Sequence, residues 1–182
     1  MEIVYSIAIA AVVIIAAVIW YISTMNAFAR LAVKIKESDS GIDVALTKRY
    51  DTLTKMLDVT KAYAKHEAET LSRIVKLRKG MSIDEMSEAN RQMDEVMGKI
   101  NVLAESYPEL KSSENFRQLQ LSITEVEEHL QAARRIYNMN VSQFNQLLAA
   151  WPSSIVGRNK GHAPKHFFEV ETQKKADVRM EF

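Results

Sequence analysis

The feature that most constrains this chain is an apolar run at residues 3–22, IVYSIAIAAVVIIAAVIWYI. The run contains no charged residue, and its about twenty residues match the length that a helix needs to cross a hydrocarbon core about 30 Å thick. In lipid every backbone polar group must be satisfied within the segment, so a helix is expected despite the many Ile and Val residues. Trp20 and Tyr21 lie at its far end, where aromatic rings favour the headgroup level. The sequence therefore predicts a transmembrane helix that begins at Ile3 and ends with Trp20, Tyr21 and Ile22.

A secretory signal peptide is the alternative interpretation of this run, because Ala27-Phe28-Ala29 has the small-x-small form of a cleavage site. No Lys or Arg precedes the run, however, and the run exceeds the usual length of a signal sequence's apolar region, so we expect a retained anchor. Arg30, Lys34 and Lys36 follow the run closely. The positive-inside rule then predicts a single-pass protein of the cell membrane, with its N-terminus outside and the rest of the chain cytoplasmic. Cleavage would instead release that rest outside the membrane.

The charge balance and the residue usage exclude several classes of protein. The 182 residues include 24 Lys and Arg and 23 Asp and Glu, a net charge of +1, whereas nucleic-acid-binding domains carry a concentrated basic excess. We therefore expect no nucleic-acid partner. With 5 Gly and 3 Pro, the chain favours long helices over turn-rich β structure. It contains no Cys, which excludes disulfides, thiolate nucleophiles and Cys-based zinc sites.

Apolar residues recur at helical spacing in three stretches behind the anchor. The first predicted helix follows a linker or helix start at Ser38-Asp39-Ser40-Gly41 and runs from residue 42 to the vicinity of Lys79-Gly80. The second begins at a capping box formed by Ser82 and Glu85 and ends at Pro108. The third runs from Ser112-Ser113 to Trp151-Pro152, and a buried Asn140 is expected to fix its register. The three apolar stripes are, in order, Ile42, Leu46, Tyr50, Leu53, Leu57, Ala64, Ala68, Leu71 and Val75; Met86, Ala89, Met93, Val96, Ile100, Leu103 and Tyr107; and Phe116, Leu119, Ile123, Val126, Leu130, Ala133, Tyr137, Asn140, Phe144, Leu147 and Trp151.

One-sided stripes must bury against one another, so the predicted fold class is all-α, with one transmembrane helix followed by an antiparallel up-and-down bundle of long, coiled-coil-like helices. The predicted divisions are an anchor at residues 1–29, a juxtamembrane segment and linker at 30–41, the bundle at 42–152 and a tail at 153–182. Phe167 and Phe168 are too apolar for a solvated tail, so the tail is expected to dock partly on the bundle. With three bundle helices, the basic cluster Arg158, Lys160 and Lys165 would lie far from the bilayer, and we assign it no lipid binding.

The sequence predicts no catalytic residue, cofactor or metal site. His66-Glu67 begins like a zinc-protease HExxH, but Thr70 stands where the second His ligand should be. No Glu-x-x-His occurs, which argues against a di-iron bundle, and no glycine-rich phosphate loop is present. Arg134-Arg135 is the densest basic pair of the third helix, and a solvated charged face is favoured there over an anion site.

Short motifs distributed over nearly the whole chain resemble those of one family. They are Lys48-Arg49-Tyr50-Asp51, Lys61-Ala62-Tyr63-Ala64-Lys65-His66-Glu67 with Thr70-Leu71, Ala104-Glu105-Ser106-Tyr107-Pro108-Glu109-Leu110-Lys111, Glu114-Asn115-Phe116 with Leu119-Gln120, Glu127, Ala133-Arg134-Arg135 with Tyr137-Asn138, Phe144-Asn145, Pro152 and Phe167-Phe168-Glu169. Together they make the chain similar to the LemA family of membrane-anchored helical proteins. Thr54-Lys55 replaces a Pro-Asn pair of the family pattern, which predicts a straighter first helix. A break near Thr54 would add a helix and reverse the position of the tail.

The resemblance implies an anchored bundle and no established reaction. We therefore expect a non-enzymatic protein whose bundle serves protein interaction or scaffolding, with an unidentified protein partner; a membrane peptidase and a second copy of the chain are the candidates. One alternative is a metal-dependent or enzymatic accessory protein that uses His66, Glu67 and Tyr63, and another is a cleaved bundle outside the membrane. The candidate interaction or motif residues are Tyr63, His66, Glu67, Tyr107, Pro108, Asn115, Arg134, Arg135, Tyr137, Asn138, Phe167 and Phe168.

Overall fold

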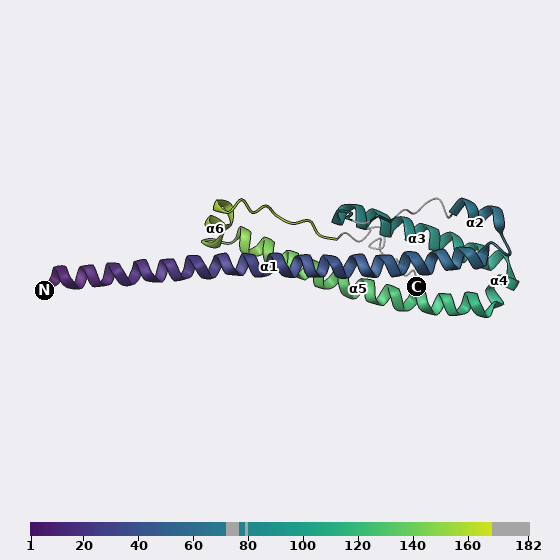
Figure 1. The fold of residues 1–182 in the computed structure, drawn as a ribbon, viewed down its shortest axis with the longest axis horizontal. Coiled ribbons are helices and arrows are strands. Elements are labelled where there is room, and N and C mark those ends of the chain that lie inside the picture. The colour runs from purple at the N-terminus through teal and green to yellow at the C-terminus, as the bar shows by residue number, and fades with distance from the viewer. Residues whose placement is uncertain (72–76, 79, 169–182) are drawn as a thin grey trace, which may run out of the picture. The chain divides into compact units, whose positions relative to one another are not determined.

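The computed structural model describes residues 1–71, 77–78 and 80–168, and all regular elements in this part of the chain are helices. The helices are α1 (Glu2–Thr60), α2 (Lys65–Leu71), α3 (Ile83–Ser106), α4 (Pro108–Ser112), α5 (Glu114–Ala149) and α6 (Ser153–Asn159) (Figure 1). The all-α prediction is therefore confirmed. The chain packs as two compact units, Met1–Glu37 with Asn138–Lys165 and Ser38–Tyr137 with the tail from His166. We call them the first unit and the second unit; α1 and α5 each contribute residues to both.

Helix α1 passes without interruption through Ser38-Asp39-Ser40-Gly41, where the sequence predicted a linker or a helix start (Figure 1). That prediction was wrong, because the buried stripe continues across these residues. Ile35, Ser38 and Ile42 are 8%, 9% and 0% exposed and follow at steps of three and four. Burial of this stripe outweighs the cost of about 1 kcal/mol for a glycine inside a helix. The helix also continues through Thr54-Lys55, so no break occurs near Thr54.

The first bundle helix was predicted to continue to Lys79-Gly80, but α1 ends at Thr60 and a turn precedes α2. The amide of Tyr63 donates to the carbonyl of Thr60 at 3.0 Å in this turn. The buried positions between Thr60 and Ala68 are small, Thr60, Ala64 and Ala68, so the stripe offers little apolar area there to hold a continuous helix. Val75 and the predicted end at Lys79 lie outside the described residues.

Helices α3 and α5 match their sequence predictions closely. The Ser82 hydroxyl accepts from the Glu85 amide and the Glu85 carboxylate accepts from the Ser82 amide, so the predicted capping box is present. Pro108 ends the second predicted helix and is also the first residue of the short helix α4. The α3 and α5 stripes supply fully buried side chains, among them Met93, Ile100, Phe116 and Leu130.

Trp151 was placed on the buried stripe of the third helix, and this prediction was wrong. Helix α5 ends at Ala149, so Trp151 no longer follows its helical register and is 82% exposed. The tail prediction holds for Phe168, which is 1% exposed, whereas Phe167 is 45% exposed.

Candidate functional site

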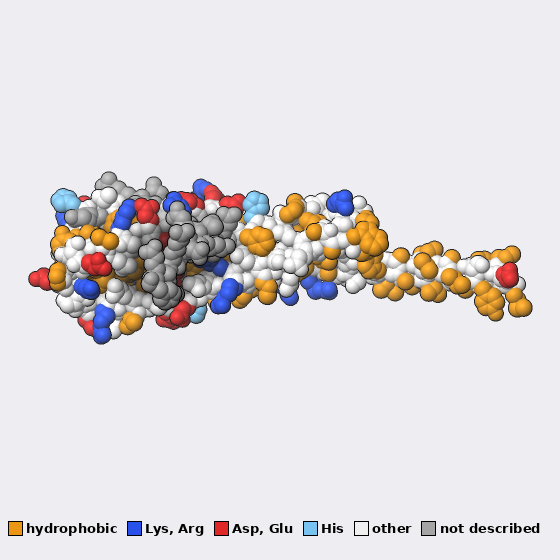
Figure 2. All heavy atoms as spheres, turned by 180° about the vertical axis from the view of Figure 1, so that it is seen from behind, with side chains coloured by type: hydrophobic (Ala, Val, Ile, Leu, Met, Phe, Trp, Pro, Cys, Tyr) orange, Lys and Arg blue, Asp and Glu red, His pale blue; other side chains and the backbone are white. Residues whose placement is uncertain are grey.

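The N-terminal part of α1 is an apolar helix against which none of the described residues pack. An 18-residue window reaches a mean hydropathy of 2.8 with none of its residues buried, which is long and apolar enough to cross a membrane. Ile3 is 76% exposed, Ile22 47%, Trp20 39% and Tyr21 36%. Figure 2 shows this segment as a run of hydrophobic side chains. The predicted span is thus one exposed, uncharged helical surface.

Burial in the first unit begins directly after this exposed segment. Thr24 is 8% exposed and Phe28 is 1% exposed. The Phe28 ring lies edge-on to Phe144 of α5 with 5.5 Å between centroids, and 4.9 Å from the ring of His162. A Cβ on Gly157 of α6 would lie 3.0 Å from Phe28 Cζ, so α6 also reaches this ring. Phe28 is therefore held by α5, α6 and the residues that follow α6.

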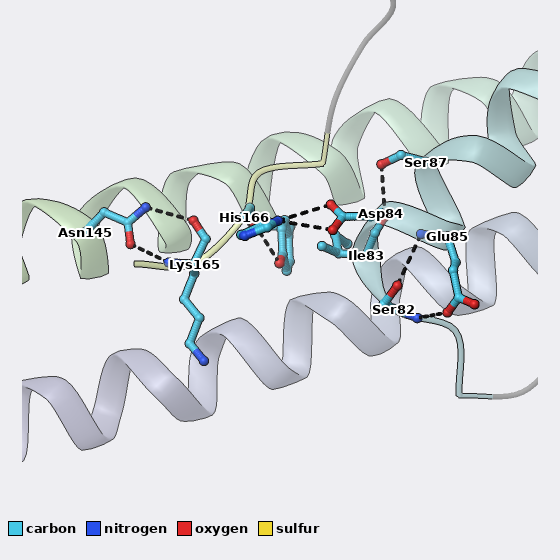
Figure 3. Close-up of polar contacts among 9 residues, drawn as sticks. Ser82, Ile83, Asp84, Glu85, Ser87, Asn145, Lys165 and His166 are labelled. Carbon is cyan, nitrogen blue, oxygen red and sulfur yellow. Dashed lines mark hydrogen bonds and ion pairs between the residues drawn. The ribbon is translucent and has the colours of Figure 1, made fainter. Parts of the chain in front are cut away.

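Two amide side chains brace the first unit. Asn140 is buried and its Nδ2 donates to the carbonyl of Lys34 at 3.3 Å, so it fixes α5 against α1 as the register argument anticipated. Asn145 donates to the carbonyl of Lys165 at 2.9 Å and accepts from the Lys165 amide at 2.8 Å (Figure 3). This reciprocal pair pins the extended tail to α5.

The same contacts correct the expected position of the basic tail. Gly157 and His162 lie against Phe28, which is six residues beyond Ile22, the end of the predicted span. The distance from Ile22 to Phe28 along the helix axis is about 9 Å. The tail was expected far from the bilayer because three bundle helices were predicted. The turn after Thr60 and helix α2 add a further helix, and because each added helix of an up-and-down bundle reverses the end at which the chain emerges, that prediction of the tail's position no longer holds. The tail's basic cluster, Arg158, Lys160 and Lys165, thus belongs to the unit that contains the span.

The second unit contains a buried cation at Arg49, which is 3% exposed. Its Nη1 donates to Asn90 Oδ1 at 2.7 Å and to the Asn90 carbonyl at 3.1 Å. Its Nη2 lies 2.6 Å from Asp94 Oδ1 and also pairs with Glu127 Oε1. One guanidinium therefore joins α1, α3 and α5, and its charge is compensated by two partly exposed carboxylates. We call these four residues the Arg49 cluster.

The docked tail of the second unit contacts two of the predicted motif residues, Arg134 and Tyr137. The Arg134 guanidinium lies 4.9 Å from the centre of the buried Phe168 ring. Burial lowers the pKa of Arg134, while Asp94 and Glu127 act in the opposite direction. The Tyr137 hydroxyl donates to the His166 carbonyl at 3.1 Å, and burial raises the pKa of Tyr137 to about 12. His166 Nδ1 lies 3.1 Å from Asp84 Oδ2 at the start of α3 (Figure 3).

The other predicted residues are not part of this tail site. Tyr63 and His66 are exposed at the turn and in α2, and the His66 carbonyl accepts from the Thr70 hydroxyl at 3.0 Å. Tyr107 is half-buried, and Pro108 and Asn115 are exposed near the α3–α4–α5 junction. Arg135 is exposed and Asn138 is half-buried on α5. The side chain of Glu67 and residue Glu169 lie outside the described part. Within that part, no group of three or more His, Asp or Glu side chains could hold a metal ion.

Sequence reasoning missed Arg49, Asn90 and Asp94, although one signal was present. Arg49 lies three residues after Leu46 and four before Leu53, so it occupies a position of the stripe to which Tyr50 was assigned. A charged residue at a buried position indicates a paired group, since isolated burial of a charge is costly. Its partners could not be identified, because Asp94 and Glu127 follow only from the packing of three helices.

In the part of the chain that the structure describes, an exposed apolar helix at the N-terminus is followed by packed helices. These features define a class of helical proteins with a candidate membrane span. Comparison with known proteins narrows this class. A sequence model of the LemA family matches residues 38–182. The chain is 29% identical over 163 residues to "Protein LemA" of Metamycoplasma hominis, an alignment that covers 87% of this chain and 74% of that protein. The chain belongs to the LemA family.

Proposed function

We propose that this chain is a non-enzymatic, single-pass protein of the cell membrane whose helical units act as a protein-interaction or scaffolding module on the cytoplasmic side. The observation that carries the proposal is the N-terminal segment of α1, a wholly unburied apolar helix within a family member. A surface of this kind needs lipid or a partner to cover it. The basic residues after the span, and none before it, support the cytoplasmic orientation.

The packing of Phe28 supports a retained anchor over a cleaved signal. Cleavage after Ala29 would remove Thr24 and Phe28, which are 8% and 1% exposed. Loss of a buried Phe side chain costs about 3–5 kcal/mol. A signal peptide has no reason to supply core residues to the mature protein. Mass determination of the membrane-extracted protein is expected to show an N-terminus that includes residues 1–29, and a chain that begins at Arg30 would contradict the proposal.

The interaction role can be tested by photo-crosslinking in cells. A crosslinking amino acid would replace Val102 of α3 or Leu121 of α5, which are 62% and 61% exposed, with Lys111 as a polar control position. We expect crosslinks to a distinct protein, with a membrane peptidase and a second copy of the chain as the two leading candidates. Absence of any protein crosslink, together with a monomer in detergent, would count decisively against an interaction module.

The enzymatic alternative makes a separate claim about His66 and Glu67. Under our proposal a His66→Ala/Glu67→Ala double variant keeps the wild-type phenotype and crosslinks, and purified wild-type protein contains no stoichiometric transition metal. A lost phenotype with retained folding, or metal that the double variant fails to bind, would favour the accessory enzyme instead.

A further inference from the structure

The two polar and aromatic contacts of the first unit fix the register of α5 against α1. Asn140 meets Lys34, and Phe144 meets Phe28, so a step forward along α5 is a step back along α1. Helix α5 therefore runs antiparallel to α1, and its C-terminal end approaches the predicted span. Continued to Ala149, the last residue of α5, this register reaches about residue 24 of α1, just past the end of the predicted span, and the turn that carries Trp151 follows directly. The aromatic residues Trp20 and Tyr21 lie about one helical turn from that level.

At this level the first unit exposes apolar side chains that the fold leaves uncovered. Trp151 is 82% exposed and Ile155 of α6 is 48% exposed. Their neighbours Ser154, Val156 and Gly157 are buried, so α6 is firmly packed while its Ile155 face points outward. An exposed Trp in the turn that leads into a packed helix, near the end of a span, is the arrangement of an interfacial aromatic anchor.

The charges of the first unit fit an anionic surface. Its Lys and Arg residues are Arg30, Lys34, Lys36, Arg158, Lys160 and Lys165, and its acidic residues are Glu2 and Glu37. Glu2 lies at the opposite end of the span, and residues 138–165 contain no acidic residue at all. On the face drawn in Figure 2, the part of this unit next to the bare end of α1 displays blue side chains and no red ones.

We propose that the turn at Trp151 together with α6 forms a second membrane contact, in which Trp151 and Ile155 enter the headgroup layer and Arg158 and Lys160 bind anionic lipid headgroups. The layer is about 5–7 Å thick on each side of the hydrocarbon core, so a structure near the level of residue 24 lies within it. The inference rests on the anchor of the proposed function. It adds that the C-terminal part of α5 and α6 seat the first unit on the same bilayer that α1 enters.

The test measures the depth of Trp151 in full-length protein reconstituted in lipid nanodiscs. The chain has 2 Trp residues, so Trp20→Phe leaves Trp151 as the sole tryptophan, which can be excited selectively over the tyrosines. Lipids brominated close to the headgroup end of their acyl chains should quench Trp151 about as strongly as they quench Trp20 in the matched Trp151→Phe variant. A Trp20→Phe/Trp151→Phe/Leu121→Trp variant, with its Trp at an exposed position of the second unit, is the control that should not be quenched.

The outcomes separate this inference from the proposed function. Quenching of Trp20 without quenching of Trp151 overturns the second contact and leaves the anchor standing. Absence of quenching for Trp20 itself overturns the anchor and the second contact with it. An emission maximum of Trp151 equal to that of the Leu121→Trp control, in every lipid tested, likewise rejects the contact.

The charge component is tested in the Trp20→Phe background by comparing phosphatidylcholine discs with discs that contain phosphatidylglycerol. Anionic lipid should deepen the quenching of Trp151, and Arg158→Gln/Lys160→Gln should reverse this gain, with the docking equilibrium falling about fivefold for each cation removed. Lys48→Gln/Lys111→Gln removes two exposed cations of the second unit as the matched control. Equal quenching in both lipids, or equal loss in both double variants, would overturn the role of Arg158 and Lys160.

Discussion

Arg49 places a permanent positive charge where the helical period of α1 calls for an apolar side chain. The cluster tolerates this because its guanidinium is planar and presents donors to Asn90, Asp94 and Glu127 at once. The carboxylates of Asp94 and Glu127 are 48% and 33% exposed, so water still shares them. Because water still solvates these two carboxylates, they remain stable as charged groups when Arg49 is replaced. The loss of folding stability in such a variant should therefore be moderate.

Arg49→Met is expected to lower the free energy of unfolding by about 2 kcal/mol, because hydrogen bonds to charged groups are lost while the apolar stem is kept. Arg49→Lys should also destabilise the protein, since one ammonium cannot reproduce the forked contacts to three helices. Arg91→Met, at an exposed arginine of α3, is the matched control and should change little. Urea unfolding in detergent measures all three. A stable Arg49→Met variant would show that the cluster adds no net stability.

Tyr137 predicts an alkaline loss of stability. Its folded-state pKa is raised to about 12 by burial and by the charges of Asp39 and Asp84, against an ordinary value of 10.0. Above pH 10 the unfolded chain therefore loses this proton first, which favours unfolding. Tyr137→Phe should be about 1 kcal/mol less stable near neutral pH, because the bond to His166 is gone. Its unfolding midpoint should converge with that of wild type between about pH 10 and about pH 12. Parallel pH profiles would contradict this reading.

Single residues differ in how far they can be predicted from the sequence. Asn140 was predicted as a buried register residue, because an Asn within an apolar stripe has few other uses, and its bond to Lys34 bears this out. Trp151 was misassigned, because a periodic count cannot see that α5 ends two residues earlier. His166 and Asp84 are 82 residues apart, and their pairing follows from docking of the tail rather than from any local pattern.

At the scale of elements, the helix boundaries that are fixed by a few neighbouring residues could be predicted from the sequence, and the other boundaries could not. Ser82 and Glu85 satisfy each other's backbone groups, and Pro108 cannot donate a helical hydrogen bond, so both boundaries follow from a few residues. Ser38-Asp39-Ser40-Gly41 has the composition of a linker, yet neighbours along the stripe keep it helical. The turn after Thr60 has neither Pro nor Gly. Tertiary packing decided both of these cases against local propensity.

Phe28 is the element-scale test of the first unit, because α1, α5 and α6 all depend on it. Phe28→Ala should lower the free energy of unfolding by about 3–4 kcal/mol and expose α6 to protease, since a buried aromatic ring is lost. Val33→Ala, at a 57% exposed position of the same helix, should stay within about 0.5 kcal/mol of wild type. Thermal unfolding and limited proteolysis in detergent would measure this difference. Equal effects of the two variants would mean that Phe28 does not hold α6.

At the scale of the whole molecule, charge is unevenly divided between the two units. The first carries six basic and two acidic residues, a net +4. Because the whole chain is +1, the remaining residues carry a net −3. A near-neutral total therefore hides a basic first unit and an acidic second unit, which the overall composition could not reveal. The basic residues beside the span support the cytoplasmic orientation that we propose for the bundle.

The proposed orientation predicts a labelling pattern that the cysteine-free sequence makes simple to test. Glu2→Cys should react with a membrane-impermeant maleimide in intact cells. Ser112→Cys, exposed on α4, should react only after permeabilisation. The labelling can be read by gel shift. The reverse pattern would place the bundle outside, and reaction of Ser112→Cys in intact cells with loss of residues 1–29 would indicate a secreted product.

The bond from Asn140 to Lys34 joins residues 106 positions apart, and this separation has a consequence for biosynthesis. A ribosome adds about 5–20 residues per second, so about 5–20 s pass between the emergence of Lys34 and that of its partner. Throughout this interval the nascent chain already holds its span while Phe28 still lacks Phe144. The first unit is thus completed late in translation. Under the proposed anchoring, premature termination before residue 138 would leave a membrane-inserted chain whose apolar residue Phe28 is uncovered, which is a signal for chaperones and degradation.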